Sequence, residues 1–164
     1  MRIPLSSIER QTKNKKYPYY GAATLLDYVE NFIFDGIFLL FGEDGTVITE
    51  AGNPVLQYVW GKMWVNNHAH VFQGKCGYST EFVYMLCSQM QVGDIVSGMA
   101  QPKISQGRLN AKQILIPDMS LAIAYSNMTG EIFKTIRYCT EKIKLLQETR
   151  DRLLPKLMCG EFNL

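Results

Sequence analysis

The sequence predicts an α+β protein in which a β-rich domain precedes a long C-terminal helix. From about residue 17 to residue 117, short apolar runs alternate with turn residues, which is typical of strands. After Pro117 the apolar residues change to helical spacing. Because 164 residues fit one globular domain with an extended element, we expect a domain at residues 1–117 and a helical region at residues 118–164.

The composition is that of a folded soluble protein, with 47% hydrophobic and 20% charged residues. The net charge of +2 is too small to identify a nucleic-acid binder by itself, so charge has to be examined locally. The four cysteines show no C-x-x-C spacing, which argues against a zinc cluster. Neither a signal peptide nor a membrane-spanning run is recognisable, and we therefore expect a cytoplasmic protein.

Three apolar runs define the expected strands. Residues 37–41 lead into a Gly-Glu-Asp-Gly turn at residues 42–45. Residues 55–60 and 63–72 stand on either side of the pair Gly61-Lys62. Because a glycine between two apolar runs often marks a chain reversal, we expect these two runs to form a hairpin around Gly61-Lys62.

A helix is expected at residues 79–90. Ser79 can cap its N-terminus, and Glu81 lies in the first turn, where a carboxylate is favourable. The apolar residues Phe82, Leu86 and Met90 then recur at helical spacing.

A heptad seam follows Pro117. Steps of three and four connect the residues of this seam: Tyr125, Thr129, Ile132, Ile136, Cys139, Ile143, Leu146, Arg150, Leu153 and Leu157. Gly130 weakens the helix near its start by roughly 1 kcal/mol. Pro155 is expected to end or kink it near Leu154, so the straight helix should span about residues 131–154.

The seam has two interpretations. Most helices with an apolar stripe pack on their own domain. The length, the strict period and the charged flanks favour pairing with another helix in a coiled coil instead. The contacts expected in that coiled coil are Ile132, Ile136, Cys139, Ile143, Leu146, Leu153 and Leu157.

The sequence contains no motif of a nucleotide-binding or hydrolytic enzyme. G-x-x-x-x-G-K-[ST], G-x-G-x-x-G and G-x-S-x-G are all absent. The Gly-Glu-Asp-Gly turn at residues 42–45 cannot replace a phosphate-binding loop, because two carboxylates would repel phosphate.

Two histidines stand in the stretch VNNHAHVF, residues 65–72. If this stretch is a strand, Asn66, His68 and His70 project from one face. His-x-His can chelate a metal, but a third ligand is needed and the residues that follow contain no acid. Their polar face could equally hydrogen-bond within the sheet or form part of a recognition surface beside Lys62 and Lys75.

Five blocks, in order, carry a family resemblance: KYPYYGAATLLDYVENFIFDG, FLLFGEDG, GKMWVNNHAHVF, GMAQPKISQGRLNAKQILIP and a helix ending in ETRDRLLPKLMCGEF. They resemble a target-recognition domain and the conserved helix after it in the specificity subunit of type I restriction-modification systems. The resemblance covers about residues 16–162. Complete subunits of this family normally carry two recognition domains and two helices, whereas this chain has one of each.

The resemblance implies a non-catalytic DNA target-recognition domain at residues 1–117 and a coiled-coil spacer at residues 118–164, without a cofactor. It implies sequence-specific binding to double-stranded DNA that directs methyltransferase and restriction subunits to a bipartite target. Two chains pairing their helices antiparallel as a homodimer would restore the two-domain arrangement and read an interrupted palindrome. The alternatives are a small metal-dependent enzyme using His68 and His70, and a coiled-coil adaptor that does not bind DNA.

DNA contacts need Lys and Arg for phosphates, and Asn, Gln, Arg or His for base edges. A basic N-terminal stretch beside tyrosines and a polar loop near residue 101 meet this requirement, although the basic stretch could equally be a solvated tail. The expected DNA-binding residues are Lys13, Lys15, Lys16, Tyr19, Tyr20, Lys62, Asn66, His68, His70, Gln101, Lys103 and Arg108.

Overall fold

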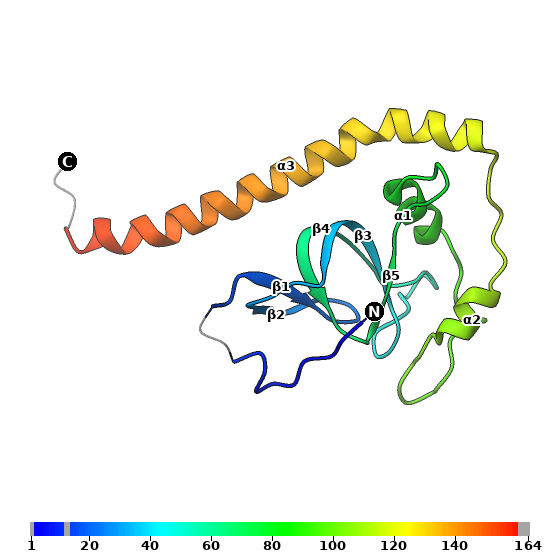
Figure 1. The fold of residues 1–164 in the computed structure, drawn as a ribbon, viewed down its shortest axis with the longest axis horizontal. Coiled ribbons are helices and arrows are strands. Elements are labelled where there is room, and N and C mark those ends of the chain that lie inside the picture. Colours follow the sequence, from blue (N-terminus) through cyan, green and yellow to red (C-terminus); the bar gives the residue numbers. More distant parts are fainter. Residues whose placement is uncertain (1, 12–13, 161–164) are drawn as a thin grey trace. The chain divides into compact units, whose positions relative to one another are not determined.

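The computed structural model of the chain describes residues 2–11 and 14–160 (Figure 1). It divides into two compact units, Met1–Ser126 and Asn127–Leu164. The described part of the first unit holds a five-stranded sheet and two short helices. The long helix α3, Met119–Met158, begins in the first unit and continues through the second. The predicted α+β class with a long C-terminal helix is confirmed.

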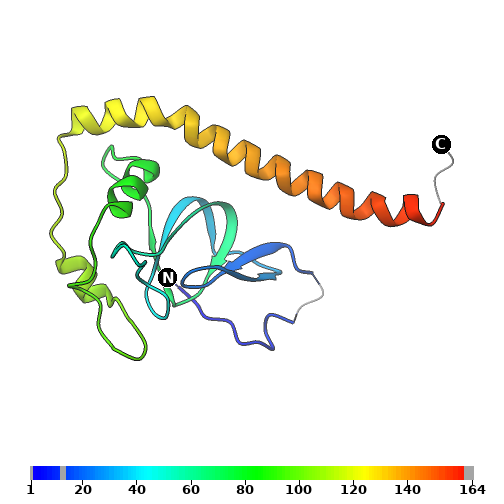
Figure 2. The same cartoon turned by 180° about the vertical axis from the view of Figure 1, so that it is seen from behind.

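The sheet consists of the strands β1 Tyr17–Tyr20, β2 Leu25–Val29, β3 Phe34–Gly42, β4 Leu56–Val65 and β5 Ala69–Phe72. Their order in the sheet is β2-β1-β4-β3-β5. Strand β1 pairs in parallel with β4, and the other neighbouring strands pair antiparallel. Helices α1, Thr80–Ser88, and α2, Gln106–Ala111, lie beside the β3–β5 part of the sheet in both views (Figures 1 and 2).

The hairpin expected around Gly61-Lys62 is wrong, because this pair lies inside β4. Gly61 faces Gly36 across the β3–β4 ladder, and the register continues without a shift on either side. Both glycines have positive φ, 82° for Gly61 and 143° for Gly36, so both strands depart from the usual strand backbone conformation at the same pair of residues. Gly61, which suggested a turn, therefore lies within a continuous ladder, where it and Gly36 adopt an unusual backbone conformation.

The stretch VNNHAHVF is not one strand, which corrects the expectation that its three polar residues share a face. Strand β4 ends at Val65 and β5 begins at Ala69, with a turn at residues 66–68 between them. The Asn66 side-chain oxygen accepts a hydrogen bond from the backbone N–H of His68 at 2.9 Å. Asparagine commonly forms such a bond two residues along the chain, and this bond stabilises the turn.

The helix expected at residues 79–90 is confirmed as α1, and the Ser79 hydroxyl accepts from the Phe82 N–H at 3.0 Å as its N-cap. Helix α2 was not anticipated. Its cap is Ser105, whose hydroxyl accepts from the Arg108 N–H at 3.4 Å.

Helix α3 is longer than the expected span of residues 131–154 at both ends. Its start is capped by Asp118, whose Oδ1 accepts from the Leu121 N–H at 2.9 Å. Near its other end Pro155 lies within the helix, and its carbonyl oxygen still accepts from the Cys159 N–H at 3.0 Å. The expectation that Pro155 ends the helix near Leu154 is wrong, because proline removes its own N–H but not its carbonyl. Among the described residues no helix is sufficiently long and apolar to cross a membrane.

Two buried clusters form the core of the first unit. One gathers β3, β4 and the start of β5, with Leu40, Met63 and Val65 fully buried. The other joins the end of β3 to the loops that follow it and consists of Phe41, Val47, Val92, Ile95 and Ile104. This second cluster anchors the loops on which the candidate site is built.

Candidate nucleic-acid interface

Three loops of the first unit are joined by backbone hydrogen bonds. Glu43 N–H donates to the His68 carbonyl at 2.9 Å, and Gly45 N–H donates to the Pro102 carbonyl at 3.0 Å. Ile104 N–H donates back to the Glu43 carbonyl at 2.8 Å. We call residues 43–45, 66–68 and 97–103 the three-loop surface. Because main-chain bonds connect the loops, their relative positions are preorganised.

The Glu43 carboxylate lies at the junction of these loops and is only 13% exposed. It forms an ion pair with Arg2, and His70 Nδ1 and Lys103 Nζ lie 3.6 and 3.7 Å from its oxygens. Arg2 Nη1 also donates to the Ala69 carbonyl at 2.8 Å. A buried carboxylate is costly unless it is paired, and here Arg2 pairs with it while His70 and Lys103 lie close to it. Glu43 therefore ties the N-terminal segment, β5 and the loop at residues 97–103 together.

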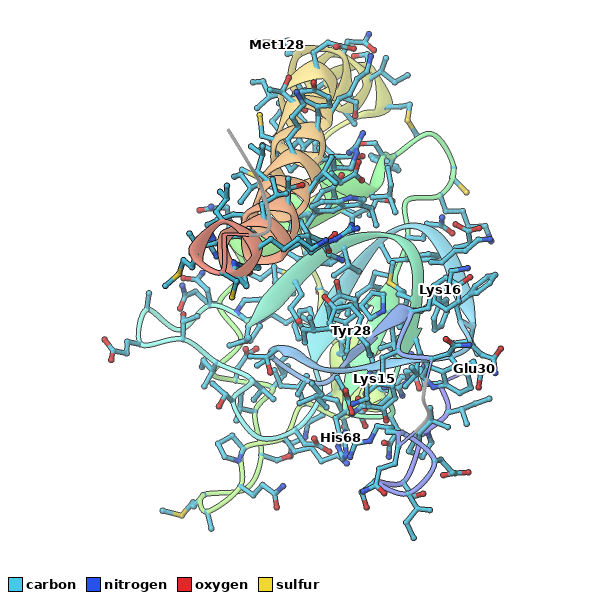
Figure 3. The ribbon with its side chains drawn as sticks, turned by 90° about the vertical axis from the view of Figure 1, so that its left-hand side faces the viewer. Lys15, Lys16, Tyr28, Glu30, His68 and Met128 are labelled. Carbon is cyan, nitrogen blue, oxygen red and sulfur yellow. The ribbon has the colours of Figure 1, made fainter. Side chains whose placement is uncertain are left out.

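His68 is the exposed member of the histidine pair. Its Nδ1 lies 2.6 Å from Asp44 Oδ1, and its side chain is 48% exposed. Figure 3 marks its position in the first unit. The contact with Asp44 orients the ring and leaves Nε2 without a partner among the described residues. His68 can thus present one ring nitrogen to a ligand.

Three of the predicted DNA-binding residues are buried instead. His70 is 5% exposed, and its Nε2 lies 2.8 Å from the Ile104 carbonyl oxygen, a distance at which an N–H there donates. Asn66 caps the turn at residues 66–68, and the Tyr19 hydroxyl accepts from the Leu5 N–H at 3.1 Å. In this conformation these side chains connect segments of the domain rather than face solvent.

The loop at residues 97–103 closes on itself. Ser97 and Lys103 exchange backbone N–H···O bonds of 2.8 and 2.7 Å. Gly98 has φ +83°, and a Cβ there would lie 2.4 Å from the Gln101 carbonyl oxygen, so this tight loop requires glycine. Gln101 and Lys103 are exposed, and Met99 at the tip is fully exposed. The loop therefore presents polar and apolar side chains on a constrained backbone.

The remaining predicted contacts lie outside these loops. Arg108 is exposed on α2, and its Nη1 donates to the Val96 carbonyl at 3.2 Å. Lys62 Nζ stands 4.6 Å from the centre of the Phe32 ring, and Tyr20 is partly buried in β1. Lys13 lies outside the described residues.

Lys15 and Lys16 border the β1–β2 pair, near Tyr28 and Glu30 (Figure 3). Lys15 Nζ lies 2.7 Å from Asp27 Oδ1, and this hydrogen bond, with one from the Tyr28 N–H, holds the pKa of the Asp27 carboxyl below its ordinary value. Lys16 keeps its ammonium group 5.3 Å from the Tyr17 ring centre. Of these two lysines, only Lys15 has its charge paired with a carboxylate.

The histidines do not converge on a shared site in this structure. His68 contacts Asp44, whereas His70 contacts Ile104 and Glu43. Within residues 2–11 and 14–160, no group of three His, Cys, Asp or Glu side chains is placed to hold a metal ion.

Some residues of this region were not identified from the sequence. Arg2 and Met99 carry no motif, and their roles depend on contacts or exposure that only the fold reveals. Gly98 did carry a usable signal, because a glycine shortly before a proline often marks a tight loop.

A second surface lies on α3 within the second unit. Its aliphatic seam residues are between 42% and 63% exposed, and Cys139 is also exposed: Ile132, Ile136, Ile143, Leu146, Leu153 and Leu157. Aliphatic residues repeated in this way along a helix are typical of a helix that packs against another helix.

Comparison with known proteins identifies relatives over most of the chain. Residues 2–154 match the family model described as the type I restriction modification DNA specificity domain. A putative type I restriction enzyme specificity subunit, S.HindORF215P of Haemophilus influenzae, is 36% identical over 120 residues, which cover 73% of this chain and 30% of that protein. The EcoprrI specificity subunit of Escherichia coli, a type I restriction enzyme subunit, is 27% identical over 116 residues, or 71% of this chain and 28% of that protein. The chain thus matches less than a third of the length of either relative.

Proposed function

The chain belongs to the type I restriction-modification DNA specificity family, and on that premise we propose that residues 1–117 form a DNA target-recognition domain that binds duplex DNA through the three-loop surface. In this proposal the chain performs no chemistry of its own. It directs methyltransferase and restriction subunits to the DNA sequence that it binds.

The observation that carries this proposal is the arrangement of the three-loop surface. Its loops are held by backbone hydrogen bonds, the Glu43 carboxylate is paired with Arg2, and Asp44 contacts His68 Nδ1. The Glu43 charge that would repel DNA is therefore compensated by Arg2, while His68, Gln101 and Lys103 remain exposed. A preorganised surface of this kind loses little conformational entropy on binding.

The predicted DNA-binding residues have different roles, which follow from the chemistry and the burial of each side chain. His68 and Gln101 read base edges in the major groove, because both can donate and accept hydrogen bonds. Lys103 and Arg108 contact phosphates, and Lys15, Lys16 and Lys62 add phosphate contacts from the β1–β2 and β4 region. Tyr19, Asn66 and His70 act by positioning these elements, since they are buried.

The second unit is proposed to act as the spacer. Its helical residues 127–158 span about 48 Å at 1.5 Å per residue, which exceeds one turn of duplex DNA. Two chains joined antiparallel through their exposed seams would place two recognition domains on one duplex. Because the pair has two-fold symmetry, its target is an interrupted palindrome.

Selection of bound sequences from a random duplex pool, with and without the methyltransferase subunit, tests this function. The expected result is an enriched interrupted palindrome, bound with an affinity that falls steeply with salt. Absence of enrichment under both conditions would contradict the proposal and leave a coiled-coil adaptor as the better account.

The contribution of the Lys103 charge to DNA binding can be tested against a matched control. Lys103→Gln should weaken binding to all duplexes and lower the salt dependence by roughly one counterion. Lys75→Gln, at another exposed lysine outside the three loops, should leave both quantities unchanged.

A further inference from the structure

We infer that two copies of α3 pair antiparallel in one specific register, in which Ile136 and Ile143 of one chain face Leu153 and Leu146 of the other. The inference rests on the proposed pairing of two chains and adds which residues meet. It uses only residues of the second unit, so it does not depend on how the two units are placed.

The starting observation is an unpartnered aliphatic stripe. The seam residues Ile132 and Ile143 are 59% and 55% exposed, and Leu146 is 63% exposed. Removing such surface from water is favourable in proportion to its apolar area. The partner that fits the stripe best is therefore one that covers all of its aliphatic members.

A second copy does so in one antiparallel register. In a two-fold symmetric pair, facing residues lie equally far from the symmetry axis along the sequence. If the axis passes between Lys144 and Leu145, the six exposed aliphatic seam residues pair only with one another: Ile132 with Leu157, Ile136 with Leu153, and Ile143 with Leu146.

A shift of half a heptad toward the N-terminus disrupts this matching. With the axis at Glu141, Ile132 faces Arg150 and Leu153 faces Thr129. Lys142, which flanks the seam, then lies one residue from the axis, so the two copies of Lys142 come close together, and like charges at flanking positions disfavour a pairing.

A shift toward the C-terminus is also worse. With the axis at Glu148, Leu146 faces Arg150 and Leu157 faces Cys139. Ile132 and Ile136 then face positions beyond Met158, the last residue of the helix in the other chain. Two of the aliphatic residues remain uncovered, so this register buries less apolar surface.

Arg150 supports the proposed register from the polar side. In the proposed register Arg150 faces Cys139 of the other chain. Arg150 is the one charged seam residue, and Cys139 has the smallest side chain among the seven residues expected to form the coiled-coil contacts. The Arg150 guanidinium already pairs with Asp151 of its own chain at 2.6 Å, and it needs no acid from the partner. A single polar residue in an apolar seam specifies register at some cost in stability.

Disulfide cross-linking tests the register. The background is the full chain with the exposed cysteines replaced, Cys76→Ser, Cys139→Ser and Cys159→Ser, and with buried Cys87 retained. In this background Ile136→Cys with Leu153→Cys should give a covalent dimer under mild oxidation. The control Thr129→Cys with Leu153→Cys should stay uncross-linked, because these positions face each other only when the axis is at Glu141.

The outcomes separate the register from the proposed function. Two results would overturn the register while leaving the dimer and its DNA binding intact. One is a disulfide between cysteines at positions 129 and 153. The other is a dimer, detected by sedimentation, in which cysteines at positions 136 and 153 do not form a disulfide. A monomer at all concentrations overturns the register together with the proposed pairing, and the duplex selection then reports separately whether one recognition domain binds DNA.

Discussion

At the residue scale, neighbouring polar side chains of one short stretch have opposite positions. His68 is half-exposed and contacts Asp44, whereas His70 two residues later is buried against the Ile104 carbonyl. His68 lies in the turn between β4 and β5, whereas His70 lies in β5, so strand alternation does not apply to the pair. One histidine is available to a ligand and the other supports the loops.

This difference predicts separate effects of two alanine variants. His70→Ala should lower the free energy of unfolding by about 2 kcal/mol, because it leaves the buried Ile104 carbonyl without its donor. His68→Ala should change it by less than about 0.5 kcal/mol, since the His68 side chain is half-exposed. Urea unfolding of both variants measures this, and equal losses would contradict the assigned roles.

The pair Lys15–Asp27 gives a prediction for titration. The pKa of Asp27 lies below its ordinary value because of its hydrogen bonds with Lys15 and the Tyr28 N–H. The ionised form therefore favours the folded state above the ordinary pKa, and this contribution is lost as pH falls through the folded value. Lys15→Gln should raise the Asp27 pKa, as followed by carboxyl NMR; an unchanged pKa would show that Lys15 does not cause the shift.

At the element scale, the sequence predicted those features of the helices and strands that depend on contacts between residues close together in the chain. Ser79 caps α1 as its sequence position indicates, because the bond joins residues three apart. The continuous strand β4 was not predictable in this way, since Gly61 is understood only from Gly36, its partner from another strand. The long α3 was predicted by its period, but its ends depended on the Asp118 cap and on the tolerance of Pro155 in the last turn.

Gly98 offers a test of the loop at residues 97–103. Gly98→Ala forces a Cβ against the Gln101 carbonyl at positive φ, which costs roughly 1–3 kcal/mol locally. We expect weaker binding to the selected duplex with the far-UV circular dichroism preserved. Gly93→Ala, where a Cβ meets nothing within 4 Å, is the control and should bind normally. Equal binding by both variants would remove the loop from the interface.

Arg150 makes a prediction about the helix pair. Arg150→Leu should tighten the dimer by roughly tenfold or more, because an apolar side chain replaces a charged one in the seam. The same change should permit the register with the axis at Glu141, in which residue 150 would face Ile132. Sedimentation equilibrium and the two cysteine pairs measure both effects, and a weaker dimer would show that Arg150 contributes attraction.

At the scale of the whole molecule, the sequence predicted a class of site and several of its exposed residues, but not how the fold brings those residues together. The heptad seam and the family resemblance led to a recognition domain followed by a spacer helix. The three-loop surface could not be predicted, because Glu43, His68 and Pro102 meet only through contacts between distant segments. The buried positions of Tyr19, Asn66 and His70 were equally inaccessible to residue type alone.

The central claim is that the three-loop surface reads DNA sequence. Its most direct test repeats the duplex selection with the double variant His68→Ala, Gln101→Ala beside the unaltered chain. The account predicts that the variant folds and still binds DNA through its lysines but enriches a different or degenerate half-site. An unchanged enriched sequence bound with unchanged affinity would contradict it.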